Sequence, residues 1–189
     1  MLLVDLSEST NDRVKGFVSI LDVEKQAADL LSQSIDTDYD RLAIDGFHSN
    51  GREKVNYLRL KEFHEPYGDS QRRVLMRQQG SLSTRMGAAL RHSGFRLSQQ
   101  RAEKRILLLV TDGEPSDIDV ADRDYLVEDA CHAVHYLGTK GITVFCLSLD
   151  KAAGSYMKKI FGARNYIIVD NALSLPLQLT RALAQIAAR

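Results

Sequence analysis

The sequence predicts an α/β fold built on a mostly parallel sheet. Segments with strand and helix patterns alternate along the chain, which is typical of strands joined by crossover helices. The run Ile106–Val110 is short and continuously apolar, as expected of a parallel strand covered on both faces. Acidic and hydroxyl side chains follow two of the apolar runs directly, at the edge where such sheets bind ligands.

Six strands are expected. The apolar start of the chain is the first, and two further runs flank His48–Arg52, whose Asn50-Gly51 dipeptide favours a hairpin turn. This hairpin places one antiparallel strand at a sheet edge, and the remaining runs are expected to be parallel. The expected strands are Met1–Val4, Arg41–Phe47, Val55–Phe63, Arg105–Val110, Ile142–Leu149 and Asn165–Val169.

Six helices are expected, on both faces of the sheet. The first is predicted from the helical spacing of Val23, Ala27, Leu30 and Leu31, and a polar turn over Asp36–Asp40 follows it. Ser83 or Thr84 is expected to cap the third, whose Met86, Leu90 and Leu97 face the core. The expected helices are Asp22–Ser34, Asp69–Arg77, Thr84–Leu97, Tyr125–Leu137, Ala152–Phe161 and Leu173–Ala188.

Composition fits one soluble domain over residues 1–189. The 25 basic and 25 acidic side chains cancel, so no overall field attracts nucleic acid or an anionic membrane. Cys131 and Cys146 are interpreted as reduced structural residues, which predicts a cytoplasmic location. No apolar run approaches the roughly 20 residues that span a bilayer. Because the chain opens inside an expected strand, we expect a domain excised from the carboxy-terminal end of a longer protein.

The oxygen-bearing residues at the strand ends predict a metal site. Asp5, Ser7 and Ser9 alternate where the first strand gives way to a loop, and Asp112 follows the fourth strand. If these two strands are neighbours, both carboxylates meet in one crevice, and Thr84 adds a third hydroxyl. Oxygen-only ligands suit a hard cation such as Mg²⁺, with Mn²⁺ as the alternative. Neutral hydroxyls leave the ion electrophilic toward an outside carboxylate.

These five positions resemble the metal-ion-dependent adhesion site of von Willebrand factor type A domains. The matching motifs are Asp-x-Ser-x-Ser after the first strand, a Thr before a central helix, and Thr-Asp-Gly after the fourth strand. The resemblance covers essentially the whole chain. It implies a Rossmann-like fold, a Mg²⁺ ion held by Asp5, Ser7, Ser9, Thr84 and Asp112, and binding of an acidic residue on a partner protein. It does not imply catalysis.

A finer resemblance is to the carboxy-terminal domains of the CbbO/NorD family. It rests on residues 5–11, 84–92, 111–117 and 160–162. That family implies an adaptor for a MoxR-type AAA+ ATPase. The CbbO type, favoured by the sequence of residues 117–129 and 163–170, implies activation of Rubisco. The NorD type, kept as the alternative, implies activation of nitric oxide reductase.

Three residues beside the metal motif are candidate partner contacts: Glu8, Arg85 and Glu114. The alternative for Glu8 is a solvated side chain, and the alternative for Arg85 is an ion pair with Asp117. The rival function of another class is a Mg²⁺-dependent phosphatase with Asp5 as nucleophile. That chemistry normally uses a second carboxylate, two residues after the nucleophile, as general acid, and Ser7 occupies that position.

Two other clusters are assigned ordinary roles. The acidic residues Asp117, Asp119, Asp122 and Asp124 are interpreted as a solvated rim, with a second, Ca²⁺-type site as the alternative. His132 and His135 share a helix face beside Cys131 but lack a further ligand, so they are interpreted as surface residues. No phosphate-binding Gly-x-x-x-x-Gly-Lys-Ser/Thr segment is present, so we expect no ATP binding by this domain.

Overall fold

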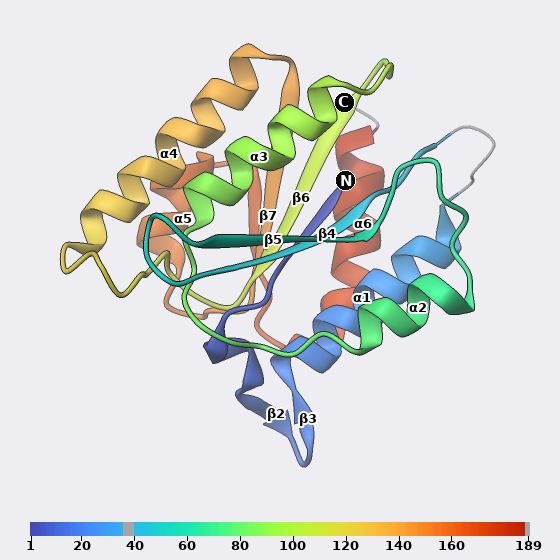
Figure 1. Ribbon diagram of the computed structural model, residues 1–189, viewed down its shortest axis with the longest axis horizontal. Helices are drawn as coiled ribbons and strands as arrows, with labels where there is room; N and C mark the ends of the chain where they lie inside the picture. The colour runs from blue at the N-terminus through green and yellow to red at the C-terminus, as the bar shows by residue number, and fades with distance from the viewer. Residues whose placement is uncertain (36–39, 188–189) are drawn as a thin grey trace.

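The computed structural model describes residues 1–35 and 40–187 and consists of three layers, a central sheet between two layers of helices (Figure 1). The strand order is β5-β4-β1-β6-β7-β8, and every neighbouring pair is parallel except β4 and β5. This confirms the predicted six-stranded sheet with one antiparallel edge strand. The strands are β1 (Leu2–Asp5), β4 (Ile44–Ser49), β5 (Val55–Lys61), β6 (Arg105–Thr111), β7 (Ile142–Ser148) and β8 (Tyr166–Ile168).

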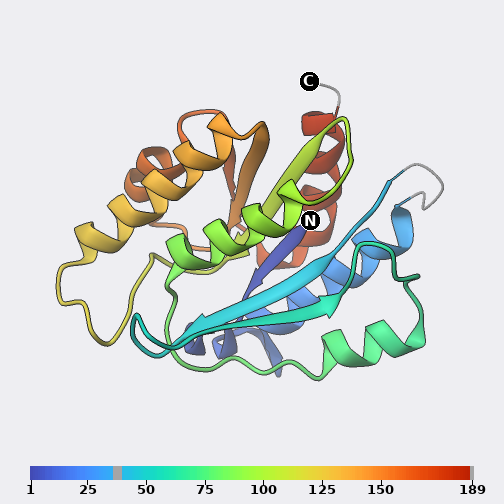
Figure 2. The ribbon, with the colours of Figure 1, turned by 45° about the horizontal axis from the view of Figure 1, so that its top comes forward.

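Helices cover both faces of the sheet, as predicted (Figures 1 and 2). Residues of α3, α4 and α5 build the core on one face, and residues of α1, α2 and α6 build the core on the other. Short 3₁₀ helices span Glu8–Asn11 and Ala172–Ser174. The α-helices are α1 (Ile20–Ser34), α2 (Asp69–Met76), α3 (Met86–Ser98), α4 (Arg123–Thr139), α5 (Gly154–Phe161) and α6 (Leu175–Ala187).

The central strands are apolar throughout because each face of the sheet has its own core. In β6, Leu107 and Leu109 pack into the core under α3 and α4, whereas Leu108 and Val110 pack into the core under α1 and α6. Successive side chains of a strand point to opposite faces, so a strand covered twice requires an unbroken apolar run. The interpretation of Ile106–Val110 as a doubly covered parallel strand is therefore confirmed.

Among the residues that predicted α1, Leu31 is buried and Leu30 is 52% exposed. One detail of the predicted helices is wrong. Ser83 and Thr84 do not cap α3: the N-cap residue is Arg85, and its N–H donates to Ser49 Oγ at 3.0 Å. Both residues instead pair through their backbones, Ser83 with Ser49 and Thr84 with Ser116. Of the expected turn over Asp36–Asp40, positions 36–39 lie outside the described residues.

A β-hairpin between the first strand and the first helix was not predicted. Strands β2 (Arg13–Lys15) and β3 (Val18–Ser19) form it, and it projects beyond the carboxyl ends of the sheet strands (Figure 1). Helix α1 follows at once, because Ser19 and Asp22 form a reciprocal capping box with bonds of 3.1 Å. The helix therefore starts two residues before its expected beginning.

Candidate metal site at the carboxyl edge of the sheet

The two acidic residues of the predicted site meet because β1 and β6 are adjacent. Their parallel register aligns Leu2 with Leu108 and Val4 with Val110. Asp5, the last residue of β1, therefore lies beside the end of β6, and Asp112 is the first residue after β6. The adjacency that the metal hypothesis required is present.

Hydrogen bonds join the predicted ligands into one cluster. Ser9 Oγ donates to Asp112 Oδ1 at 3.0 Å and lies 3.2 Å from Ser7 Oγ. Asp5 Oδ1 accepts from the Ser7 N–H at 2.9 Å and from Thr84 Oγ1 at 3.5 Å. All five predicted ligands, Asp5, Ser7, Ser9, Thr84 and Asp112, are therefore brought together.

Thr84 reaches this cluster because the preceding loop is bonded to the segment after β1. The Ser81 N–H donates to the Leu6 carbonyl oxygen at 2.8 Å, and the Glu8 N–H donates to the Leu82 carbonyl oxygen at 3.0 Å. Gly80 makes this approach possible: a Cβ there would lie 2.6 Å from Thr10 Oγ1 and 2.7 Å from the Ser7 carbonyl oxygen. Any larger residue would push the two segments apart.

The site is closed at its base and open toward solvent. Asp5, Ser7 and Thr84 are buried, whereas Asp112 is half-buried and Ser9 is exposed. A cation held here would therefore touch buried ligands on one side and face an outside group on the other. This is the arrangement that a binding site for a partner's carboxylate needs.

Electrostatics at the site favour a cation. Burial raises the pKa of Asp5, although bonds from Thr111, Ser7 and Thr84 oppose the shift. Burial, and then the negative charge of Asp5, raise the pKa of Asp112 to about 7. The bonds to both carboxylates come from hydroxyl and backbone N–H groups, and neither carboxylate has an ion-pair partner within the described residues. Two such carboxylates beside three neutral hydroxyls fit the oxygen-only donor set of Mg²⁺ or Mn²⁺.

Two residues near the site were missed from the sequence. Thr111 Oγ1 donates to Asp5 Oδ2 at 2.6 Å and so holds that carboxylate in place. Glu24 of α1 is 1% exposed, and neither of its carboxylate oxygens has a hydrogen-bond partner among the described residues. Burial, followed by the charges of Asp112 and Asp5, raises the pKa of Glu24 well above its ordinary value. Thr111 is the first residue of the Thr-Asp-Gly motif, so its position was a usable signal although no role was assigned to it, whereas nothing in the helical pattern distinguished Glu24 from a surface residue.

The three candidate partner contacts differ in their surroundings. Glu8 is exposed at the site, and Glu114 is half-buried in the loop after β6. Arg85 is only 7% exposed, and its Nε bonds to Asp117 Oδ2 at 2.8 Å. It also pairs with Asp119 through Nη2. The intramolecular alternative left open for Arg85 is the one that the structure contains.

The acidic stretch after β6 is not uniformly a solvated rim, so that interpretation is wrong for Asp117. This residue is buried, and its Oδ1 accepts from the N–H groups of Gly51 and Ile118, both at 2.8 Å. Asp119 accepts from the Arg52 N–H at 2.7 Å, and Asp122 caps α4. The stretch ties the β4–β5 hairpin to the loop after β6, which a charge pattern alone does not reveal.

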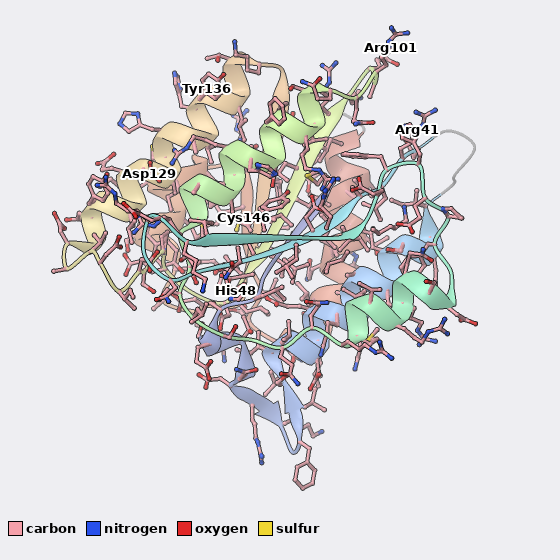
Figure 3. All side chains as sticks on the ribbon, in the orientation of Figure 1. Arg41, His48, Arg101, Asp129, Tyr136 and Cys146 are labelled. Carbon is pink, nitrogen blue, oxygen red and sulfur yellow. The ribbon has the colours of Figure 1, made fainter. Side chains whose placement is uncertain are left out.

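Neither the cysteines nor the described helices add a second site. Cys146 is buried in β7 inside the sheet layer, whereas Cys131 Sγ donates to the Lys159 carbonyl oxygen at 3.2 Å (Figure 3). Within residues 1–35 and 40–187, no three His, Cys, Asp or Glu side chains are grouped to hold a metal. None of the helices in this same part of the chain is both long and apolar enough to cross a membrane.

The fold and the strand-end oxygen cluster define a Rossmann-like α/β domain with a candidate site for a divalent cation. The sequence profile of the von Willebrand factor type A domain matches residues 1–181, and the chain belongs to this family. Protein NorD of Stutzerimonas stutzeri is 36% identical over 169 residues, which cover 89% of this chain and 28% of that protein. The chain thus spans under a third of this curated relative.

Solved structures show the same fold at low sequence identity. The PilB minor pilin of Streptococcus sanguinis superposes with a TM-score of 0.75 at 15% identity, covering 98% of this chain and 61% of that one. The manganese-loaded TRAP protein of Plasmodium vivax superposes with a TM-score of 0.60 at 18% identity, covering 92% and 69%. At these identities the likeness concerns the fold alone.

Proposed function

We propose that this chain is a protein-interaction domain that holds an acidic residue of a partner protein through Mg²⁺, with Mn²⁺ as the alternative ion. The observation that carries the proposal is the pair of carboxylates, Asp5 and Asp112, that meet hydroxyls and, within the described residues, no cationic side chain. Mg²⁺ bound there would offer a coordination position to a carboxylate from outside. Asp5 and Asp112 would balance its charge, and the hydroxyls of Ser7, Ser9 and Thr84 would complete its ligands without adding charge.

The surroundings of the site would then select the partner. Glu8 and Glu114 lie on the rim, where their charges would repel a second acidic group and so restrict which surfaces approach. Arg85 would act indirectly, because its ion pair with Asp117 holds the loop that carries Thr84. This assignment of roles rests on burial: only exposed or half-buried side chains can touch a partner.

The relatives named NorD support an accessory role in a longer protein. We propose that the chain is the substrate-recognition domain of a cytoplasmic adaptor for a MoxR-type AAA+ ATPase. The identity of 36% to proteins named NorD favours the NorD type, with nitric oxide reductase as target, over the CbbO type and Rubisco. The ATPase would then deliver its remodelling to whichever acidic residue the metal holds.

The test has two stages. The first is titration of the chain with Mg²⁺ by calorimetry, comparing Asp112→Ala with Asp170→Ala, an exposed carboxylate after β8. The second is capture of partners from a lysate of the source organism in Mg²⁺ and in EDTA, with identification by mass spectrometry. We expect Mg²⁺-dependent retention of one protein complex by the unmutated chain and by Asp170→Ala, and none by Asp112→Ala.

The identity of the retained complex separates the alternatives. Nitric oxide reductase subunits would support the NorD type, and Rubisco would support the CbbO type. Retention that is equal in EDTA, or equal for Asp112→Ala, would contradict a metal-bridged interaction. Mg²⁺-dependent hydrolysis of p-nitrophenyl phosphate that Asp5→Asn abolishes would instead favour the phosphatase alternative.

A further inference from the structure

The β2–β3 hairpin exposes an aromatic side chain next to the candidate metal site. Its strands are joined by the two-residue turn Gly16-Phe17, in which Gly16 has a φ of +60°, as hairpin turns of the primed types require. Phe17 is 90% exposed, and the guanidinium of Arg13 lies 5.4 Å from the centre of its ring. Because it is exposed, the Phe17 ring contributes almost no hydrophobic stabilisation to the fold.

The hairpin is anchored, so Phe17 has a defined place. Val14 and Val18, on its inward face, pack against the core under α1 and α6. Arg13 and Lys15 are exposed, and the pairing of the two strands shifts register between them. Within the described part of the chain neither cation has an ion pair, so the exposed part of the hairpin presents an aromatic ring and two positive charges.

The hairpin is also continuous with the metal site. The Asp12 N–H, at its base, donates to the Ser9 carbonyl oxygen at 2.9 Å, and the Ile20 N–H closes the base on the Asp12 carbonyl oxygen at 2.9 Å. From Asp12 to the turn is four residues, or on the order of 13 Å at the rise of an extended strand. The tip of the hairpin therefore stands about that far from its base at Asp12, beyond the carboxyl edge of the sheet (Figure 1).

Further exposed apolar side chains surround the same edge. Leu82, whose carbonyl oxygen accepts from the Glu8 N–H, is 40% exposed and has a φ of 65°. A left-handed conformation costs a non-glycine residue free energy, and such strain gathers at functional sites. Ile118, two residues beyond the Ser116 that pairs with Thr84, is 74% exposed. The metal ligands thus lie within a partly apolar surface.

We propose that Phe17 is a second contact point for the same partner that the metal binds. The partner is then a folded protein whose surface carries an acidic residue for the metal and, at a distance set by the length of the hairpin, an apolar recess that accepts the Phe17 ring. Acidic side chains border that recess and face Arg13 and Lys15. This inference rests on the proposed function, because the first contact is the metal-bound carboxylate.

A second contact is required on physical grounds. Specific interfaces bury about 1,200–2,000 Å² in total, far more than one carboxylate on a metal covers. Their affinity is concentrated in a few aromatic or arginine anchors that enter pockets on the partner. The anchored hairpin presents such an anchor with its orientation already set, so little conformational entropy is lost on binding.

The experiment compares two exposed aromatic residues in matched settings. Tyr136 on α4 is 53% exposed and, like Phe17, has a cation 5.4 Å from its ring centre, that of Lys140, but it lies at the far end of the molecule (Figure 3). Calorimetry with Mg²⁺ alone and the dissociation constant for the partner retained in Mg²⁺ are measured for Phe17→Ala and Tyr136→Ala. Phe17→Ala is expected to keep its Mg²⁺ affinity and to bind the partner about 10- to 30-fold more weakly, as loss of an anchor does. Tyr136→Ala is expected to change neither quantity.

The charge of the hairpin gives a second readout. The double variant Arg13→Glu and Lys15→Glu is expected to slow association by about tenfold at low salt, with the difference shrinking at high salt. Benzoylphenylalanine placed at position 17 is expected to cross-link to the retained partner in Mg²⁺, whereas the same group at position 136 is not.

The outcomes separate this inference from the proposed function. If Asp112→Ala abolishes partner binding and Phe17→Ala leaves it unchanged, the metal-bridged function stands and the hairpin contact is wrong. If the unmutated chain retains no partner in Mg²⁺, both are overturned. If Phe17→Ala weakens binding equally in Mg²⁺ and in EDTA, the two-point surface is overturned and the metal-bridged function fails with it.

Discussion

Asp112 and Asp117 lie five residues apart in one loop, yet their environments are opposite. Burial acts to raise the pKa of both. At Asp117, bonds from Gly51, Ser49, Ile118 and Arg85 outweigh burial, so its pKa falls below the ordinary value. At Asp112, burial and the charge of Asp5 prevail, and the pKa rises to about 7. One carboxylate is stabilised as an anion by the protein itself, whereas the other has no positively charged partner among residues 1–35 and 40–187.

The comparison shows what each part of the loop is built to do. Where Asp117 joins the loop to α3, the chain supplies an arginine and complete hydrogen bonding, as a structural carboxylate requires. Where Asp112 faces Asp5, the described residues supply hydroxyl and backbone N–H groups but no positive charge, so we expect the two carboxylates to destabilise the fold unless a cation binds. We expect substitutions in the two places to change stability in opposite directions.

The largest effect is expected at the structural carboxylate. Arg85→Met should lower the free energy of unfolding by about 3–5 kcal/mol, because it leaves the buried charge of Asp117 unpaired. Urea unfolding measures the change. The matched control is Arg91→Met, which breaks the half-exposed pair with Asp129 and should cost at most about 1 kcal/mol. Equal losses of stability for the two variants would show that the buried pair of Arg85 and Asp117 is no more important than the half-exposed pair of Arg91 and Asp129.

At the other carboxylate, Asp112→Asn should weaken Mg²⁺ binding by at least about 100-fold, since it removes a charged ligand. In EDTA at pH 8 the same variant should be as stable as the unmutated protein or more stable by about 1 kcal/mol, because repulsion from Asp5 disappears. Calorimetry and urea unfolding measure the two quantities, with Asp170→Asn as control. A clear loss of stability in EDTA would mean that Asp112 is a structural residue.

The buried carboxyl of Glu24 is a third case, because neither of its oxygens has a hydrogen-bond partner among the described residues. Its pKa is raised in the folded state, so the folded protein binds the proton more tightly than the unfolded chain does. Its contribution to stability is therefore fully present below the unfolded pKa of about 4.5 and is lost as pH rises toward the folded pKa.

Glu24→Met should remove that loss and raise the free energy of unfolding by about 1–2 kcal/mol at pH 8 in EDTA. Urea unfolding from pH 5 to pH 8 tests this, with the exposed Gln26→Met on the same helix as control. An unchanged pH profile would show that Glu24 is not the group responsible.

The smallest effect is expected where a hydroxyl positions a ligand. Thr111→Val removes the 2.6 Å bond to Asp5 and should weaken Mg²⁺ binding by about tenfold, as loss of a ligand's supporting bond typically does. Thr111→Ser keeps the hydroxyl and should restore most of the affinity in the same calorimetric titration. If the valine and serine variants bind equally, Asp5 is held by its other bonds.

The sequence by itself determined the class of the sheet and the residues of the candidate metal site. The apolar runs are local signals, because their period is set by the backbone, and they predicted the six strands. The Asn50-Gly51 turn is also a local signal, and it predicted the antiparallel edge. The acidic and hydroxyl residues at strand ends are likewise adjacent in the chain to the runs that position them. That is why all five candidate ligands, Asp5, Ser7, Ser9, Thr84 and Asp112, were found before the strand order was known.

Only the tertiary structure decided which groups meet across the chain. Arg85 pairs with Asp117, which is 32 positions away in the chain. Thr111 bonds to Asp5, which is 106 positions away. Glu24 is buried near Asp5 and Asp112, which are 19 or more positions away. The β2–β3 hairpin was also missed, because strands of three and two residues give too short a pattern, and its inward valines are specified by the core they cover. Packing and charge pairing depend on distance in space, and a local pattern carries no record of that distance.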